Sequence, residues 1–403
     1  DHGTSRGLGD VYKRQQEETP EVQEVPPCFK QVFSCFQDTP RLKRMKSNIR
    51  FMSGDLVDSD IRVAKTLPSK YYTDEKWFRK ILKSFKRTWQ FVGLSDQFTS
   101  VITPIDHIGR VLNEPMVRVQ DGESAQMLSN VCTHRGMVLC HQHSDAKTLQ
   151  CPYHGRTFNR DGTMKHMPGF EDVVDFPSES DDLQSFALET WNGFEFTSLN
   201  PKYSLEDVLR PLQERIGWFF SDLEYDSSRD RDWDIEANWM LYVDNYLEGF
   251  HIPYVHPELN DVLDKDGYST ECFEHGVLQI GMAKEGDVCF DIPEPSVDAG
   301  KKIAAYYWWF FPNLMINVYP WGVSVNVVVP NGAGSTTVLF RSYVKDPELM
   351  EEGAGAALDK VELQDQFVVE NCMKGLRSHS YKRGRYSAKH EQGVHHFHMK
   401  LTR

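Results

Sequence analysis

The 403-residue chain has no apolar run long enough to cross a bilayer as a helix. Its longest run, Ile303–Pro312, covers about ten residues, whereas a transmembrane helix needs roughly twenty. Positive charge is also scarce, because 45 Lys and Arg stand against 59 Asp and Glu, for a net charge of −14. That balance argues against a nucleic-acid-binding surface and gives no reason to expect an anionic membrane as a partner.

Cysteine is sparse, with eight residues scattered along the chain. Small secreted domains that depend on disulfides are much richer in cysteine, so we expect reduced thiols and a cytoplasmic protein. A basic stretch from Cys28 to Phe51 leaves organellar targeting open, although it is neither N-terminal nor serine-rich. We interpret Cys28, Cys35, Cys140, Cys272, Cys289 and Cys372, together with His141, as structural residues.

Composition predicts a globular protein, with 40% hydrophobic and 12% aromatic residues. We expect residues 1–55 to be disordered, and residues 1–15 to be an artefact because GLGDVYKRQ resembles a translated sequencing adapter. Residues 56–88 should form a helical segment that packs on the C-terminal domain. Residues 89–200 should form a small antiparallel β domain, and residues 201–403 a second domain with a sheet and helices.

The pattern of apolar residues predicts particular elements in these domains. Thr73–Trp89 has a helical stripe of Trp77, Ile81, Phe85 and Trp89. Strands are expected near 90–94, 100–106, 115–120 and 125–131, then at 304–311, 314–319, 323–329 and 336–344. A long helix should run from about Ala356 to Ser378. Gly353–Leu358 imitates a dinucleotide-binding loop, but it follows an acidic turn rather than a strand, so we interpret it as the start of that helix.

The strongest chemical signal lies in the β domain. Cys132 and His134 are followed, after 16 residues, by Cys151 and then by His154, which gives the spacing C-x-H-x16-C-x2-H. Zinc also binds two cysteines and two histidines, but zinc fingers group the cysteines apart from the histidines. Here each loop holds one of each, which suits a binuclear iron–sulfur cluster with both thiolates on one iron and both imidazoles on the other. Gly136 and Gly155 would let the loops approach that cluster.

A second signal lies in Asn238–Pro257, which has the pattern of an amphipathic helix. Asp244, Glu248 and His251 share one stripe of this helix, and His256 follows Pro253. On an ideal helix two histidines five residues apart point about 140° away from each other. A helix end or kink at Pro253 would let both imidazoles converge on one metal ion. Taken alone, two ordinary histidines near a helix end are the more economical interpretation.

Asp365 offers a third ligand, because it lies within the apolar stripe of the last long helix. A buried carboxylate needs a cation or a metal ion, and Lys360 or Arg377 could supply the cation instead. Two histidines and one carboxylate form the facial triad of non-haem Fe(II) oxygenases. We therefore predict that His251, His256 and Asp365 bind one iron. The apolar stripe itself consists of Leu358, Val361, Val368, Val369, Cys372 and Leu376.

The two motifs together resemble one known family. The C-x-H…C-x2-H segment resembles a Rieske [2Fe–2S] domain, and N-x-x-E-x-x-H-x4-H (Asn245, Glu248, His251, His256) resembles the α subunit of Rieske non-haem iron oxygenases. The similarity covers residues 56–403. One departure is Arg156, where many relatives carry a Trp. The resemblance implies an α+β protein: a Rieske domain plus a helix-grip catalytic domain, an antiparallel sheet wrapped on helices.

The resemblance also implies roles for these residues. Cys132, His134, Cys151 and His154 would bind the cluster, and Glu248 and Asn245 would assist catalysis. Relatives form homotrimers, in which an acid at the position of Glu248 links the mononuclear-site histidine to a Rieske histidine of the next subunit. Here Glu248 would link His251 to His134 or His154 of the neighbouring chain. The structural alternative for Glu248 is an exposed helix acid with an i,i+4 contact.

The function implied is the oxygenase component of a multicomponent enzyme that uses O2 as co-substrate. No flavin, nicotinamide or plant-type ferredoxin motif is recognisable, so electrons from NAD(P)H would arrive through a separate reductase, with or without a ferredoxin. We expect hydroxylation of a small, aromatic substrate. Choline- or carnitine-like monooxygenation, or demethylation of a trimethylammonium or methyl ether compound, is the alternative. Two hypotheses from other functional classes are a Rieske protein that only transfers electrons and a zinc protein with a structural role.

The substrate itself is not encoded in a motif. Aromatic and amide residues near the second metal motif are the candidates for the pocket wall. They are Tyr242, Asn245, Phe250, Tyr254, Trp308, Phe310, Asn317 and Trp321.

Overall fold

The computed structural model describes residues 55–402, without the side chains of Lys265 and Asp266. The predicted disorder of residues 1–55 and the artefact at 1–15 therefore lie, except for Asp55, outside the described residues. The structural roles expected for Cys28 and Cys35 lie outside them too. The described chain is an α+β protein in which all the strand pairs of residues 55–402 are antiparallel, as predicted.

The segment that was expected to form one helix from Thr73 to Trp89 is divided. It consists of α1 (Lys70–Thr73), α2 (Glu75–Ile81) and the 3-10 helix η3 (Leu82–Arg87). The prediction of a single helix was wrong because Asp74, in an extended conformation, accepts a hydrogen bond from the Lys76 amide and starts a new helix. The stripe nevertheless packs inward, since Ile81, Phe85 and Trp89 are buried.

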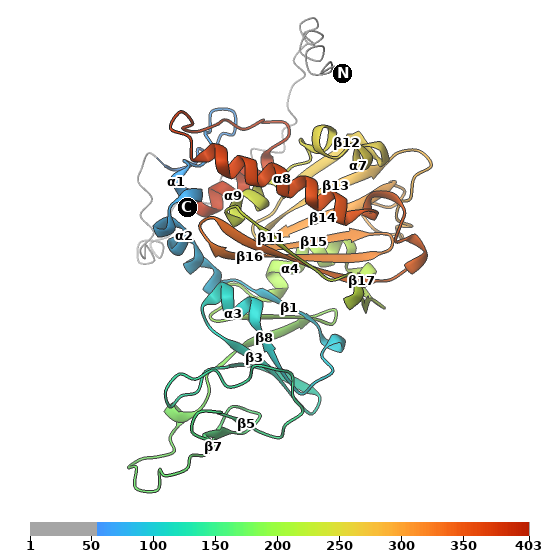
Figure 1. The fold of residues 1–403 in the computed structure, drawn as a ribbon. Helices are drawn as coiled ribbons and strands as arrows, with labels where there is room; N and C mark the ends of the chain where they lie inside the picture. The colour runs from blue at the N-terminus through green and yellow to red at the C-terminus, as the bar shows by residue number, and fades with distance from the viewer. Residues whose placement is uncertain (1–54, 403) are drawn as a thin grey trace, which may run out of the picture. The chain divides into compact units, whose positions relative to one another are not determined.

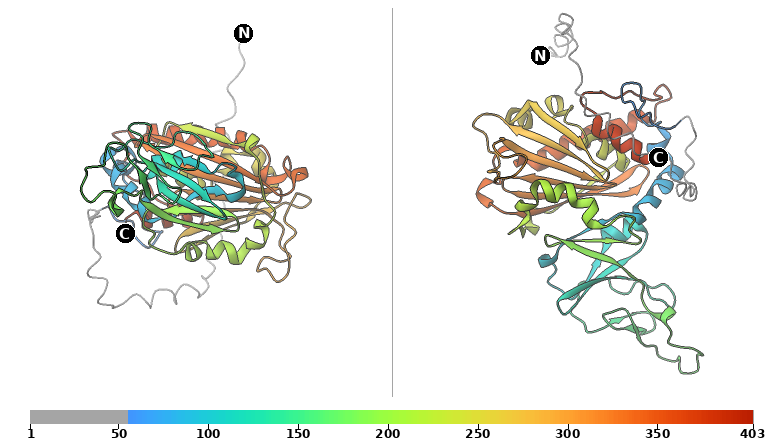
Figure 2. Two further views of the ribbon diagram at one scale, coloured as in Figure 1. Left: turned by 90° about the horizontal axis from the view of Figure 1, so that it is seen from below. Right: turned by 180° about the vertical axis from the view of Figure 1, so that it is seen from behind.

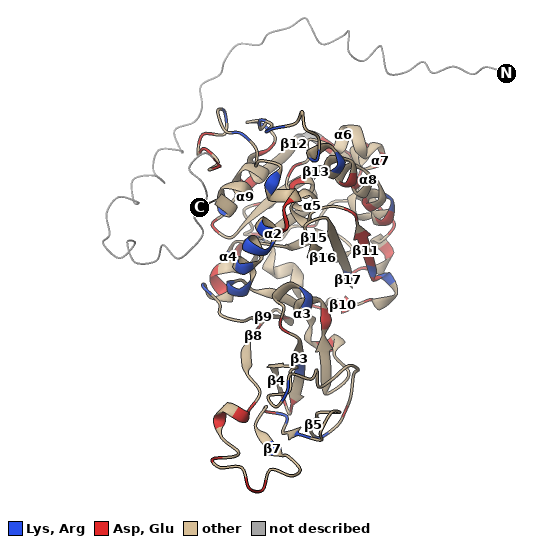
Figure 3. Ribbon diagram, turned by 60° about the vertical axis from the view of Figure 1, so that its left-hand side comes forward, with Lys and Arg blue, Asp and Glu red and all other residues tan. Residues whose placement is uncertain are grey.

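The β domain contains the four strands that were predicted for it and five more. Its six-stranded sheet has the order β1-β9-β8-β4-β3-β2. A second, three-stranded sheet has the order β5-β6-β7. The strands are β1 (Gln90–Leu94), β2 (Ile102–Ile105), β3 (Met116–Asp121), β4 (Ser124–Ser129), β5 (Leu149–Gln150), β6 (Thr157–Phe158), β7 (Met164–His166), β8 (Ser185–Trp191) and β9 (Phe194–Ser198). The domain also holds α3 (Asp106–Leu112), η4 (Ser95–Gln97) and η5 (Glu179–Asp181). Several aspartates and glutamates lie in the segment between β7 and β8, which is partly red in Figure 3.

An eight-stranded antiparallel sheet forms the centre of the C-terminal region. Its order is β10-β17-β16-β15-β14-β13-β12, with β11 also paired to β17. The four predicted strands are β14 (Ile303–Phe310), β15 (Leu314–Tyr319), β16 (Gly322–Gly332) and β17 (Ser335–Val344), and they form the predicted meander. The sequence did not single out β10 (Glu224–Tyr225), β11 (Arg231–Ile235), β12 (Leu263–Cys272) or β13 (Gly276–Ala283).

Helices lie on both faces of this sheet (Figures 1 and 2). The long helix α8 (Leu358–Leu376) corresponds to the predicted one and crosses one face, where it contacts α5 (Trp239–Tyr246). Helix α4 (Leu205–Ile216) lies on the opposite face and buries Leu205, Leu209, Leu212 and Ile216. The remaining helices are α6 (Ile252–Val255), α7 (Pro257–Val262), α9 (Gln392–Thr402), η6 (Gly217–Phe220), η7 (Ser227–Arg229), η8 (Pro347–Leu349) and η9 (Gly353–Gly355).

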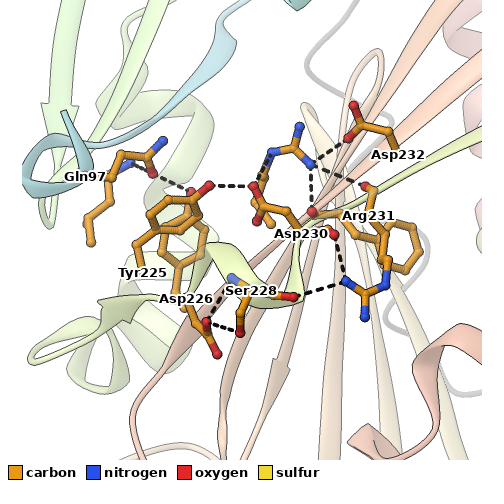
Figure 4. Close-up of polar contacts among 11 residues, drawn as sticks. Gln97, Tyr225, Asp226, Ser228, Asp230, Arg231 and Asp232 are labelled. Carbon is orange, nitrogen blue, oxygen red and sulfur yellow. Dashed lines mark hydrogen bonds and ion pairs between the residues drawn. The ribbon is translucent and has the colours of Figure 1, made fainter. Parts of the chain in front are cut away.

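Polar contacts connect strand β17 of the large sheet to the β domain and to the residues around β11 (Figure 4). The Tyr343 hydroxyl donates to Oε1 of Gln97 at 3.1 Å, and Gln97 belongs to the β domain. Arg341 on the same strand contacts Asp230 at 3.3 Å and Asp232 at 2.8 Å. The two ion pairs thus hold the residues around β11, which precede α5, to β17, and the Tyr343 bond joins the β domain to the same strand.

Of the helices in the described part of the chain, none combines the length and the apolar character that a membrane span requires.

Two candidate metal centres

Two loops of the β domain bring the predicted cysteine and histidine pairs together. In each loop the glycine four residues after the cysteine donates its amide to the cysteine's carbonyl oxygen, Gly136 to Cys132 and Gly155 to Cys151, both at 3.0 Å. These glycines have φ of +73° and +76°, a region in which a side chain would be strained. The two loops therefore make the same kind of turn, and each carries one cysteine and one histidine.

The residues of these loops fit a cluster with two thiolate and two imidazole ligands. The rings of His134 and His154 lie 4.9 Å apart, and Cys132 and Cys151 are free and 2% exposed. Nδ1 of His154 is buried and has no hydrogen-bond partner among residues 55–402, as expected of a nitrogen that faces a metal ion. Burial raises the pKa of the Cys132 thiol, and the adjacent Cys151 thiol adds to that effect.

Arg156, the departure from the family pattern, is buried beside this centre. Its side chain is 2% exposed and pairs with Asp181 at 2.7 Å. The guanidinium also lies 5.4 Å from the ring centre of Phe176 and 5.7 Å from that of Phe158. Arg156 thus fills a core position with a paired charge, and its backbone carbonyl accepts the Cys151 amide.

Cys140, Cys272, Cys289, Cys372 and His141 are not among the predicted ligands of this centre. The amide of Cys140 donates to Asn130, and His141 is exposed. Cys272 and Cys372 are exposed free thiols and Cys289 is a half-buried one.

We expect Cys151→Ala or His154→Ala to yield protein without the visible absorption of an iron–sulfur cluster. Removing one of the four ligands leaves one iron with an incomplete set, while the second centre lies on other elements. Visible spectroscopy with iron and sulfide analysis measures this, and Cys140→Ala is the control that should keep its colour. A coloured Cys151→Ala protein would mean that this cysteine is not a ligand.

The second centre is built around an interruption between two helices, but the first helix does not end where it was predicted to end. Helix α5 ends at Tyr246, not at Pro253, and Pro253 is the second residue of the short helix α6. Proline is well accepted in a first helical turn because the amide it lacks has no partner there. His251 precedes α6 and His256 follows it, so one helical turn separates the two histidines.

His251, His256 and Asp365 come together at this interruption. One potential ligand atom from each residue lies within 4.8 Å of the others. Nε2 of His256 is 2.9 Å and Nε2 of His251 is 3.6 Å from Oδ1 of Asp365, and the two imidazole rings are 5.1 Å apart. Burial is the largest single influence and opposes protonation of His256, but the hydrogen bond and the charge of Asp365, together with Gln364 and Glu248, raise the pKa of this histidine overall.

Further residues orient the three side chains. Nδ1 of His251 lies 2.8 Å from Oε1 of Glu248, and Nδ1 of His256 lies 2.8 Å from Oε1 of Gln364. With Nδ1 bound to an acceptor, Nε2 of each ring is left to face the centre, which is how outer groups commonly orient metal-binding histidines. Asn245 donates through Nδ2 to Oδ1 of Asp365 at 2.7 Å.

Two other expectations for this region were wrong. Asp244 does not share a face with Glu248, because α5 ends between them; it contacts Tyr72 at 2.8 Å and His398 at 2.7 Å. The inward face of α8 also differs from the predicted stripe, since Glu362, Val369 and Met373 are buried and Cys372 is exposed.

The cations proposed as alternatives for Asp365 are occupied elsewhere or out of reach. Lys360 pairs with Glu258, and within residues 55–402 neither Lys360 nor Arg377 forms an ion pair with Asp365.

A cavity opens beside the second centre. Five tyrosines line it: Tyr242, Tyr246, Tyr268, Tyr307 and Tyr319. A row of paired residues crosses its floor from β13 to β16, with Gln279 opposite Tyr307, Tyr307 opposite Asn317, and Asn317 opposite Ser324. The wall therefore alternates aromatic faces with amide and hydroxyl groups.

Only part of this lining was predicted. Tyr242, Asn245 and Asn317 line the cavity, whereas the exposed Phe250 and Tyr254 and the buried Trp308, Phe310 and Trp321 do not. On β14 the wrong face was chosen, because neighbouring residues of a strand point to opposite sides and Tyr307, not Trp308, faces the cavity. The Tyr307 hydroxyl is buried and has no partner within residues 55–402. The two-residue alternation along β14 places Tyr307 on the face opposite to Trp308 and Phe310, but it does not say which of the two faces lines the cavity.

Comparison with known families agrees with this geometry. Residues 88–177 match the Rieske [2Fe-2S] domain, and residues 220–403 match the ring hydroxylating alpha subunit (catalytic domain). The chain is 30% identical over 366 residues to the chloroplastic choline monooxygenase of Arabidopsis thaliana, covering 84% of this chain and 82% of that protein. It is also 30% identical over 357 residues to the carnitine monooxygenase oxygenase subunit of Escherichia coli K12, covering 84% and 93%.

Solved structures share the fold. A quaternary ammonium Rieske monooxygenase, CntA, in complex with L-carnitine aligns with a TM-score of 0.68 at 24% identity, over 85% of this chain and 96% of that one. Naphthalene 1,2-dioxygenase from Rhodococcus sp. bound to indole aligns with a TM-score of 0.64 at 17% identity, over 84% and 93%. The predicted Rieske and helix-grip architecture is thereby confirmed. The chain belongs to the Rieske non-haem iron oxygenase family, as the oxygenase (α) subunit of an oxidoreductase that uses a Rieske cluster and a mononuclear iron.

Proposed function

We propose that this oxygenase subunit acts on a quaternary ammonium compound. The observation that carries the proposal is the set of five tyrosines around the cavity, since a cation bound over aromatic rings gains electrostatic attraction from each ring face. The polar row across the cavity floor suits an apolar ring less well. Choline and carnitine are the substrates in the names of the similar monooxygenases. The sequence alone favoured hydroxylation of an aromatic compound. The observation that still supports this second candidate is the fold shared with naphthalene 1,2-dioxygenase.

In the proposed reaction a substrate C–H bond becomes C–OH, with one oxygen atom from O2. The other oxygen atom leaves as water, so two electrons and two protons are consumed. The cluster, bound by Cys132, His134, Cys151 and His154, would supply electrons, and the iron, bound by His251, His256 and Asp365, would activate O2.

Side chains of this protein hold the proposed iron ligands and one wall of the cavity in place. Asn245 restrains the Asp365 carboxylate through a 2.7 Å hydrogen bond, and Gln364 holds the Nδ1 proton of His256. Tyr246 is itself fixed, because its hydroxyl donates to Asn317 at 2.8 Å. These bonds keep the ligand atoms and one cavity wall in place before substrate enters.

Members of this family receive electrons from a separate reductase, and one solved structure is described as giving insight into inter-subunit electron transfer. We extend this to a homotrimer in which each cluster serves the neighbouring subunit, with a ferredoxin as an optional carrier. The division into a helical segment (56–88), a Rieske domain (89–200) and a catalytic domain (201–403) belongs to the same proposal.

Oxygen uptake with a surrogate reductase tests the substrate class. Trimethylammonium compounds should couple O2 consumption to product, while aromatic acids and aryl methyl ethers should not. We expect Tyr319→Leu to raise KM for the cation about 2- to 30-fold, because one cation–π contact contributes about 0.5–2 kcal/mol. Tyr381→Leu, on the exposed surface, is the control and should leave KM unchanged. Coupled turnover of an aromatic acid alone would replace the proposal by ring hydroxylation.

A further inference from the structure

Glu362 is a buried acid in the cavity for which the two metal centres give no role. It lies on the inward face of α8, is 2% exposed, and lines the same cavity as the tyrosines. Oε2 accepts the Tyr242 hydroxyl at 2.5 Å, and Oε1 accepts Nε2 of Gln366 at 3.2 Å. Both partners are neutral, so the carboxylate is hydrogen-bonded but its charge is not balanced.

The charges around the cavity are one-sided. Three carboxylates line it, from Glu248, Asp365 and Glu362, and no lysine or arginine is among the described residues of its wall. Glu248 and Asp365 contact the imidazoles of His251 and His256. Within residues 55–402, Glu362 forms no ion pair with any cationic side chain.

An unbalanced carboxylate in this position is unfavourable in the empty protein. Burial raises the pKa of Glu362 to about 7, although the Tyr242 hydrogen bond opposes the shift. A cation that entered the cavity would favour the ionised form and relieve that penalty. A ligand carboxylate beside Glu362 would meet a like charge and no basic side chain of the described cavity wall, which disfavours its entry.

We propose that Glu362 is the specificity-determining residue that selects a compact cationic substrate without a carboxylate group, such as a quaternary amino alcohol. The inference rests on the proposed function and narrows it, because zwitterions of the carnitine type are disfavoured. Glu362 precedes Asp365 by one turn of α8, a rise of about 5 Å, so a cation held beside Glu362 has its carbon atoms close to the candidate iron site.

The experiment measures binding of three probes to the iron-loaded protein by calorimetry. The probes are choline, its uncharged isostere 3,3-dimethylbutan-1-ol, and L-carnitine. Wild-type protein should bind choline at least about 30-fold more tightly than either of the others, since truncating one side of a buried charge pair costs about 2 kcal/mol or more. Glu362→Gln should weaken choline binding by a similar factor and leave the isostere unchanged.

Two further variants separate a specific effect from a general one. Glu258→Gln removes an exposed acid that pairs with Lys360 and should bind all three probes like wild type. Tyr242→Phe keeps the Glu362 charge, removes its hydrogen bond, and should retain the preference for choline over the isostere. Iron content and the cluster spectrum verify that each variant is folded.

The outcomes distinguish this inference from the function on which it rests. If Glu362→Gln keeps the full preference for choline, Glu362 is not the selector, and the quaternary ammonium function still stands. L-carnitine binding as tight as choline would overturn the exclusion of carboxylates. Binding of the isostere as tight as that of choline in wild type would overturn both proposals.

Discussion

Asp365→Ala is expected to remove the mononuclear iron and abolish turnover while the Rieske spectrum stays intact. Oδ1 of Asp365 lies within 2.9 Å of His256 Nε2 and 3.6 Å of His251 Nε2, so the variant loses the only carboxylate that meets both imidazoles within residues 55–402. Two histidines alone are a weak site for Fe(II), which prefers a ligand set with a carboxylate. The ratio of iron to acid-labile sulfide, measured with the visible spectrum, reports the loss.

Glu370→Ala is the matched control on the same helix. Glu362 and Glu370 are the other acids of α8 within about one and a half turns of Asp365, and they would be the first to test as a third ligand in its place. In the structure Glu362 accepts the Tyr242 hydroxyl. Glu370 accepts the Glu236 amide at 3.0 Å, away from the histidines. Glu370→Ala should therefore keep its iron. Full iron content in Asp365→Ala would show that another acid completes the centre.

The parts of this protein that were predicted correctly depend on short-range patterns. The Cys132–His154 motif specifies its own geometry, because each loop needs only a cysteine, a histidine and a glycine at fixed spacing. The strands β14 to β17 follow from runs of aromatic and β-branched residues separated by tight turns. The helix α8 follows from its periodic apolar residues.

The errors arise where tertiary contacts decide between local alternatives. Pro253 can end one helix or begin another, and α6 uses the second option. On β14 both Tyr307 and Trp308 are aromatic, so the sequence alone does not say which faces a cavity and which faces the core. The burial of Glu362 was not predicted, because its hydrogen-bond partner Tyr242 lies 120 positions away in the chain.

Glu248→Gln is expected to separate the two metal centres functionally without emptying either. In the structure Oε2 of Glu248 accepts the His251 amide at 3.0 Å and Oε1 lies 2.8 Å from Nδ1 of the same residue. A carboxylate oxygen can accept two hydrogen bonds, so capacity remains for a histidine N–H of the neighbouring subunit. A glutamine can still accept from His251 through its carbonyl, but its NH2 group cannot accept a second imidazole N–H.

Both centres of the Glu248→Gln protein should therefore fill with iron, and the cluster should still be reduced by the reductase. The transfer of an electron from the reduced cluster to the mononuclear centre should slow by about 100-fold or more in a single-turnover experiment. Glu258→Gln, which alters an exposed acid paired with Lys360, should transfer at the wild-type rate. If Glu248→Gln also transfers at that rate, Glu248 only orients His251 within its own chain, and the centres communicate by another route.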